Sequence, residues 1–98
     1  MFIVRDVFYL KFGAFRNAYQ LLQKAKQDNI MPNGDARILS DFTGHSYRLI
    51  FENQYESLAA FETELSEGMK KSEWQQWYVN FKEHVESSSR EILKLHKL

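Results

Sequence analysis

The sequence has no cysteine among its 98 residues, which excludes a disulfide framework, a thiolate nucleophile and a cysteine-ligated metal. It also has no excess of charge of either sign, because 13 lysine and arginine residues balance 13 aspartate and glutamate residues. Binding to nucleic-acid phosphates requires clustered basic residues, so this composition argues against a nucleic-acid partner. With 44% hydrophobic and 15% aromatic residues, the chain is not intrinsically disordered.

Long apolar runs are absent as well, and none approaches the roughly 20 residues that a membrane span requires. Residues 1–6 have no charged region followed by a long apolar stretch, so no secretory signal is visible. We therefore expect a soluble cytoplasmic protein in which residues 1–98 form a single domain. A chain of this length buries only roughly 60–65% of its unfolded surface, so a lone monomer has a small core.

The first third of the chain predicts a strand followed by a helix. Residues 2–11 are rich in β-branched and aromatic side chains and contain neither glycine nor proline, which is typical of a strand. Apolar residues occupy both alternating sets of positions, so we expect this strand to be covered on both faces. After Gly13, apolar residues recur at helical spacing from Phe15 onwards. This helix is expected to end near residue 28, ahead of Pro32.

The middle of the chain predicts a hairpin. Residues 31–34, Met-Pro-Asn-Gly, carry the strongest turn signal in the sequence. Residues 36–42 and 46–52 then have the composition of two short strands. The segment 43–45 between them is short enough for a hairpin turn, in which Gly44 can supply a positive φ.

The second half predicts two helical stretches, each with a capping signal. We expect the first to begin after Asn53, which has Glu56 three residues on as its capping partner. Gly68 interrupts this stretch. Ser72 with Gln75 supplies a second capping box, from which another helix follows.

The remainder of the chain predicts a helix, a loop and a strand. Aromatic residues at helical spacing favour a helix that packs its aromatic stripe into the core; the stripe consists of Trp74, Trp77, Tyr78 and Phe81. Three consecutive serines at residues 87–89 are expected to form a loop. Residues 90–98 then close the chain as a final strand.

This order of elements, β-α-β-β-α(α)-β, predicts an α+β ferredoxin-like fold of the β-α-β-β-α-β type, with an antiparallel sheet and helices on one face. Because the helices cover only one face, the apolar residues on both sides of the first and third strands require another cover. A second copy of the chain is the simplest one, so we expect a homodimer joined sheet to sheet.

Four short motifs resemble those of NIPSNAP-like proteins. They are residues 9–13 (that family's "T-L-K-P-G"), residues 56–58 ("D-S-L"), residues 72–75 ("P-E-W-Q") and residues 87–93 ("S-x-x-x-x-I-L"). They follow the family's order over nearly the whole chain. Phe12 stands where the family pattern has proline. Asp6 stands where it tends to have arginine, so a role that rests on that arginine does not transfer.

The resemblance implies a dimeric α/β-barrel, in which the sheets of two ferredoxin-like chains face each other and enclose a cavity. Relatives on this scaffold include small cofactor-free monooxygenases, haem-degrading oxygenases and stress-responsive proteins. NIPSNAP-like proteins themselves have no agreed catalytic residues. The resemblance therefore implies a fold and suggests an activity only by analogy.

Neither the histidines nor the helical acidic residues indicate a site. His45, His84 and His96 fall on different predicted elements and lack metal-ligand spacing, so we expect no metal site and no cofactor. The acidic residues between positions 62 and 67, Glu64 among them, have the pattern of a solvated helix face.

Charged residues within the predicted strands are more informative; these are Arg5, Asp6, Arg37, Asp41 and Arg48. A buried charge is costly unless it is paired, so one interpretation is that they pair across neighbouring strands or at the dimer rim. The alternative is that arginines and tyrosines line the cavity between the sheets and hold an anionic or aromatic-hydroxyl ligand. With Trp77 at the cavity edge, the candidate ligand-binding residues are Tyr9, Arg37, Tyr47, Arg48 and Trp77.

Three functions remain open from the sequence, and whether the protein is an enzyme stays undecided. The first is a NIPSNAP-like homodimer that binds a small ligand or regulates, without chemistry of its own. The second is a cofactor-free monooxygenase of the antibiotic-biosynthesis type, acting on a small aromatic or polyketide-like substrate in an apolar pocket. A polar cluster of Asn, His, Trp or Arg in one cavity would favour the second. The third is a structural or interaction subunit with a sealed core.

Overall fold

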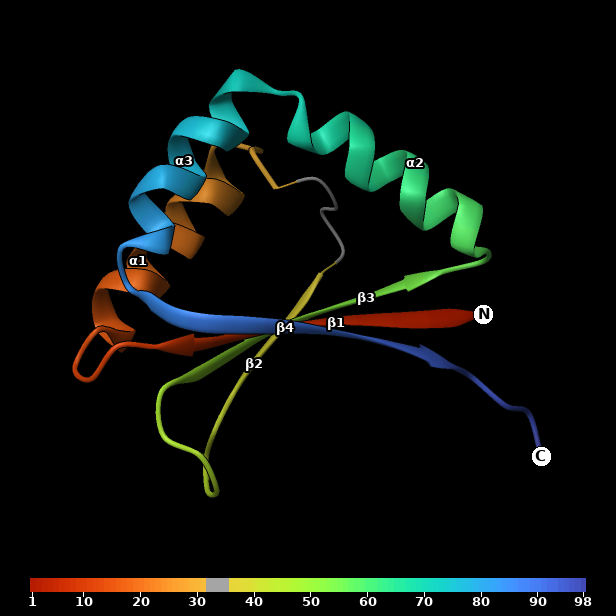
Figure 1. Cartoon of the computed structure of the whole chain (residues 1–98), viewed down its shortest axis with the longest axis horizontal. Helices are drawn as coiled ribbons and strands as arrows, with labels where there is room; N and C mark the ends of the chain where they lie inside the picture. The colour runs from red at the N-terminus through yellow and green to blue at the C-terminus, as the bar shows by residue number, and fades with distance from the viewer. Residues whose placement is uncertain (32–35) are drawn as a thin grey trace.

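A computed structural model describes residues 1–31 and 36–98 of the chain. Its elements are β1 (Phe2–Leu10), α1 (Phe15–Gln27), β2 (Arg37–Ser40), β3 (Arg48–Tyr55), α2 (Leu58–Met69), α3 (Ser72–Lys82) and β4 (Val85–Lys94). The four strands form one antiparallel sheet in the order β2-β3-β1-β4. The helices all lie on one side of this sheet (Figure 1), so the predicted ferredoxin-like α+β fold is confirmed.

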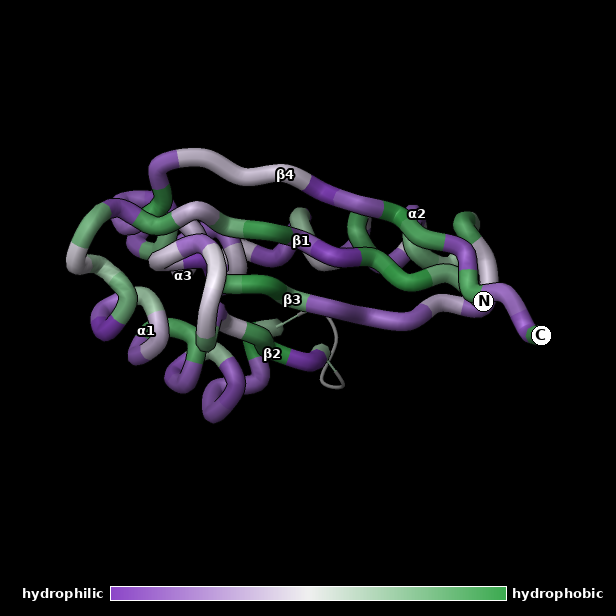
Figure 2. The backbone as a smooth tube through the Cα atoms, turned by 90° about the horizontal axis from the view of Figure 1, so that it is seen from below, coloured by the Kyte–Doolittle hydropathy of each residue, from purple (hydrophilic) through white to green (hydrophobic). Residues whose placement is uncertain are grey.

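The strand register decides which residues face the helices. Residues directly opposite each other in an antiparallel pair lie on the same face of the sheet. Val4 lies opposite Asn53 and Phe8 lies opposite Leu49, so the even positions of β1 and the odd positions of β3 face the helices. The other set forms the open face, which none of the described helices covers; Figure 2 shows it from below, with β4, β1, β3 and β2 side by side.

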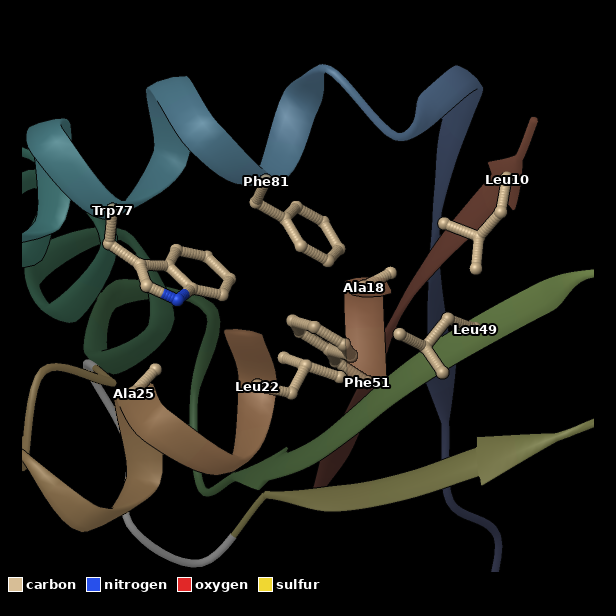
Figure 3. Close-up of a cluster of buried hydrophobic side chains, with 8 residues drawn as sticks. All are labelled: Leu10, Ala18, Leu22, Ala25, Leu49, Phe51, Trp77 and Phe81. Atoms are coloured by element: carbon tan, nitrogen blue, oxygen red, sulfur yellow. The ribbon is translucent and has the colours of Figure 1, made fainter. Parts of the chain in front are cut away.

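The hydrophobic core fills the space between the sheet and the helices α1 and α3. Its buried members are Leu10, Ala18, Leu22, Ala25, Leu49, Phe51, Trp77 and Phe81 (Figure 3). Phe81 is fully buried, with its ring centre 4.8 Å from that of Trp77 and 5.2 Å from that of Phe8. The core interpretation of the aromatic stripe is therefore confirmed for Trp77 and Phe81, whereas Trp74 is half-buried and Tyr78 is exposed.

The predicted start of α2 was wrong. Asn53 does not cap the helix but lies within β3, because pairing with β1 extends that strand to Tyr55. The N-cap is Ser57, whose hydroxyl oxygen accepts a hydrogen bond from the Ala60 backbone N–H at 3.1 Å. A tertiary strand pairing has thus overridden a local capping signal.

The predicted capping box of α3 was also wrong. Ser72 is the first helical residue, and Lys71 occupies the N-cap position without a side-chain hydrogen bond. The Gln75 side-chain amide donates instead to the Met69 carbonyl oxygen, at 3.0 Å. This bond holds the end of α2 against the beginning of α3.

The predicted loop at residues 87–89 is part of β4. These serines pair with Tyr9, Phe8 and Val7 of β1, so backbone hydrogen bonding compensates for their weak strand preference. The final strand consequently begins at Val85 and ends at Lys94, rather than spanning residues 90–98.

The predicted hairpin is present, but its two strands pair over fewer residues than predicted. Arg37–Ser40 pairs with Arg48–Tyr55, and Gly44 adopts the expected positive φ of 101°. The turn predicted at residues 31–34 lies largely outside the described residues. Within the described part of the chain, no helix is long and apolar enough to cross a membrane.

Candidate functional site

A cavity of about 690 Å³ lies between the helix-facing side of the sheet and the helices α2 and α3. The sheet contributes residues of β1, β3 and β4, and the two helices contribute the opposite wall. Six aromatic rings line the cavity: Phe8, Phe51, Tyr55, Phe61, Trp74 and Tyr78. Its volume falls within the range typical of small-molecule sites, and a mainly apolar wall with few polar groups is also typical of such sites.

An ion pair forms part of the cavity wall. Asp6 and Arg90 lie opposite each other on β1 and β4, and the Arg90 Nε donates to Asp6 Oδ1 at 2.6 Å. The Arg90 guanidinium carbon also lies 5.3 Å from the ring centre of Phe61 on α2. A cation at this distance from an aromatic ring is attracted by the ring face. The arginine therefore connects the sheet to the helix that covers the cavity.

Asn53 contributes the most unusual polar group of the cavity. The register of β3 with β1 directs it to the helix-facing side, where it lines the cavity. Its side-chain oxygen is buried and has no hydrogen-bond partner among the described residues. A buried acceptor without a partner is uncommon because it loses its hydration without compensation. The position of Asn53 thus offers a hydrogen-bond acceptor to a molecule in the cavity.

Two further polar side chains in the cavity wall come from the helices. Glu64 of α2 lines the cavity and is half-buried, although the sequence pattern assigned it to a solvated helix face. Gln75 of α3 also lines the cavity, and its amide nitrogen is bonded to the Met69 carbonyl.

The predicted ligand-binding residues do not come together at this cavity. Tyr9 and Arg48 lie opposite each other on the open face. The Arg48 Nη2 lies 2.8 Å from Asp41 Oδ1, and its hydrogen bond lowers the pKa of the Asp41 carboxyl below its usual value. Arg37 belongs to the same face, where it pairs with Glu52.

The other two predicted residues lie elsewhere. Tyr47 precedes β3, and its ring centre is 5.3 Å from that of the exposed Phe12. Trp77 is buried in the core, where its indole N–H donates to the Leu21 carbonyl oxygen at 2.8 Å. Neither residue lines the cavity between the helices and the sheet.

The centre of the open face carries an ion-pair network built around Glu52. Glu52 is only 4% exposed and accepts hydrogen bonds from Arg37 and from the Arg5 Nε, the latter at 2.9 Å. The hydrogen bond from Arg37, supported by that from Arg5, lowers the pKa of the Glu52 carboxyl against the opposing effect of burial. The interpretation that the strand charges pair across neighbouring strands is confirmed for Arg5 and Arg37, and for the pair Asp6 and Arg90.

Sequence reasoning missed the cavity residues Asn53, Glu64 and Arg90. The sequence pattern places Asn53 at a helix cap because the predicted strand ends at residue 52. Extending the strand alternation past Phe51 would have placed Asn53 on the same face as the core. No comparable signal distinguishes Glu64 from its neighbouring glutamates. Within residues 1–31 and 36–98, no group of three histidine, aspartate or glutamate side chains is arranged to hold a metal ion.

Comparison with solved structures identifies the fold class of this chain. A NIPSNAP-like domain protein from Burkholderia xenovorans matches with a TM-score of 0.88 and 15% identity, over 97% of this chain and 84% of that one. A NIPSNAP family protein from Agrobacterium tumefaciens matches with a TM-score of 0.81 and 20% identity, over 96% and 92%. A structure described as an antibiotic biosynthesis monooxygenase matches with a TM-score of 0.74 and 9% identity, over 99% and 100%.

These matches confirm the resemblance to NIPSNAP proteins at the level of the fold. The same ferredoxin-like α+β fold is shared with the monooxygenase structure, and at such identities the fold is what the likeness shows. No protein-family model matches the sequence, and no curated protein matches it.

Proposed function

We propose that the protein is a homodimer that binds a small, partly aromatic molecule in the cavity between its helices and its sheet. The carrying observation is the cavity of about 690 Å³, whose wall combines aromatic rings with the Asn53 acceptor, which has no hydrogen-bond partner among the described residues. A purely structural subunit is expected to have a sealed core, so an open cavity favours ligand binding. The proposed location is the cytoplasm, on the compositional grounds given above.

The ligand-binding proposal is tested by filling the cavity. Leu65→Trp on α2 introduces an indole into the cavity wall, whereas Leu58→Trp makes the same change two turns earlier, at an exposed position outside the wall. A library of aromatic fragments is screened by thermal shift against both variants and the parent protein. Fragments that stabilise the parent and Leu58→Trp should not stabilise Leu65→Trp. The proposal would be contradicted if the fragments stabilised both variants equally, or if no fragment stabilised the parent protein.

Support for the dimer comes from the open face. Apolar side chains surround its ion-pair network, and two of them, Leu39 and Leu93, are 40% exposed on the outer strands β2 and β4. A second copy of the same face offers apolar contact area to these residues, and charged groups already paired within one chain cost less to bury.

The dimer proposal has a matched pair of variants on one strand. Leu39 and Ile38 are neighbours in β2 with exposures of 40% and 41%, but Leu39 belongs to the open face and Ile38 to the helix-facing side. Light scattering at micromolar concentration should give twice the chain mass of 11.7 kDa for the parent and for Ile38→Glu. Leu39→Glu should shift the protein towards 11.7 kDa. A monomeric parent protein would overturn the proposal.

A second candidate function is cofactor-free oxygenation of an aromatic substrate. The observation that favours it is that Asn53, Trp74 and Arg90, from three different elements, line the same cavity. In such a reaction an electron-rich substrate carbon itself reduces O₂; a CH₂ group becomes a carbonyl and the second oxygen atom leaves as water. Oxygen uptake with a phenolic anthrone tests this function. Consumption that is no faster than in protein-free buffer, or that is unchanged in Asn53→Ala, would rule it out for that substrate class.

A further inference from the structure

The charged residues of the cavity leave one carboxylate without a cation. Asp6, Glu64 and Arg90 are the charged side chains among its described lining residues. The Arg90 Nε forms an ion pair with Asp6 Oδ1 at 2.6 Å. Glu64 forms no ion pair within the described part of the chain, so the lining residues carry a net single negative charge. An anionic ligand would therefore add a like charge to this wall.

The hydrogen-bonding groups of the cavity show the same bias. The side-chain oxygen of Asn53 is a buried acceptor without a partner among the described residues. The Arg90 Nε is bonded to Asp6 Oδ1, and the Gln75 amide nitrogen is bonded to the Met69 carbonyl oxygen. The Asn53 oxygen and the Glu64 carboxylate are thus two acceptors in the cavity wall to which a ligand could donate.

The aromatic wall favours a cation as well. The ring faces of Trp and Tyr attract cations through their quadrupole, and Trp74, Tyr78 and Phe61 all line the cavity. The Arg90 guanidinium already lies 5.3 Å from the Phe61 ring centre, so one cation of the chain itself is placed against this wall.

We infer that the ligand of this cavity is a protonated amine attached to a hydrophobic body. The ammonium group donates hydrogen bonds to the acceptors that are vacant, the Asn53 oxygen and the Glu64 carboxylate, and the body packs among the aromatic rings. This inference rests on the proposed ligand-binding function, and it differs from the sequence-based expectation of an anionic or aromatic-hydroxyl ligand held by arginines. In this proposal, the Glu64 carboxylate is the group that favours a positively charged ligand over a neutral or negative one.

The test uses three compounds that share one aromatic body: 1-naphthylmethylamine, 1-naphthalenemethanol and 1-naphthoate. Their affinities for the parent protein are measured by calorimetry at pH 7 and fixed ionic strength. The ammonium compound should bind most tightly, by about tenfold or more over the carboxylate, because it alone brings a positive charge to the Glu64 carboxylate.

Two isosteric variants separate the charge of Glu64 from the general charge of α2. Glu64→Gln should weaken binding of the ammonium compound by about three- to tenfold and leave the alcohol unchanged. Glu62→Gln, on the same helix but exposed and outside the cavity wall, should change neither.

The outcomes of this experiment distinguish failure of the ammonium inference from failure of ligand binding itself. If the alcohol or the carboxylate binds as tightly as the ammonium compound, or if Glu64→Gln does not reduce the preference, the inference is wrong while ligand binding stands. If none of the three binds, the proposed function fails together with the inference. Tight ammonium binding that is lost equally in Glu64→Gln and Glu62→Gln would indicate long-range charge rather than the cavity, and would also overturn the inference.

Discussion

Replacing Glu52 by Gln should destabilise the protein by removing the charge at the centre of the open face. The substitution keeps the size and shape of the side chain, so the packing beneath it is preserved. It replaces a carboxylate, which accepts hydrogen bonds from both Arg5 and Arg37, with a neutral amide whose nitrogen cannot accept. Two guanidinium groups then lose their shared anion.

The size of the effect follows from the burial of the three groups. A hydrogen bond to a charged group contributes about 1.5–3 kcal/mol and a neutral one about 0.5–1.5 kcal/mol. Arg5 and Arg37 are 38% and 68% exposed, so water partly replaces what they lose and the lower part of this range applies. We expect the free energy of unfolding to fall by about 1–2 kcal/mol, which corresponds to a Tm lower by roughly 4–16 °C for a domain of this size.

The same change should alter the pH dependence of stability. Because the pKa of Glu52 is lower in the folded protein than its ordinary value of 4.5, its contribution is complete above that value. It is lost as the pH falls through the lower, folded pKa. The difference in stability between the parent and Glu52→Gln should therefore be constant near neutral pH and narrow on acidification below about 4.5.

Urea denaturation at one fixed protein concentration, repeated from pH 7 down to pH 3, measures this difference. Glu91→Gln is the matched control, because Glu91 is 53% exposed and lies 3.9 Å from the same Arg5. Its effect should stay within about 0.5 kcal/mol. Equal effects of the two substitutions, or a Glu52→Gln difference that does not change with pH, would refute the assignment of Glu52 as a buried, ionised centre.

Two further substitutions test the packing and the capping of the helices. Phe81→Ala should lower the free energy of unfolding by about 3–5 kcal/mol, because it empties a fully buried site among three aromatic rings. Val79→Ala, at a half-exposed position of the same helix that borders the cavity, should cost less than about 1 kcal/mol. Equal losses in the two variants would argue against this core. Ser57→Ala should cost about 1 kcal/mol through loss of the N-cap bond to Ala60, whereas Ser57→Asp should restore most of it. Urea denaturation measures both, and an unaffected Ser57→Ala would contradict the capping role.

The fold could be predicted from the sequence because its signals are long and mutually consistent. The β-branched and aromatic composition of β1, the helical spacing in α1 and Gly44 in the hairpin all indicate the same arrangement, and the structure agrees. The errors arose where a local signal competed with strand pairing. Asn53 carries a capping signal and residues 87–89 a loop signal, but both lie beside β1 and take its extended conformation.

The cavity could not be predicted because its residues depend on register. Asp6, Asn53 and Arg90 come from three strands, and a shift of one residue in any strand would turn its side chain to the open face. The predicted site residues Tyr9 and Arg48 do lie together, but on the opposite side of the sheet from the cavity. Alternation alone indicates which residues share a face and not which face the helices cover.

The most direct test of ligand binding in the cavity is to locate a bound ligand by NMR. Naphthylmethylammonium is titrated into ¹⁵N-labelled protein, and the side-chain N–H signals of Asn53 and Trp74 report on the cavity wall. We expect saturable shifts of these two signals, with the backbone amides of Tyr9 and Arg48 on the open face unchanged. Saturable shifts centred on Tyr9 and Arg48 instead, or no saturable shift at all, would contradict binding in the cavity.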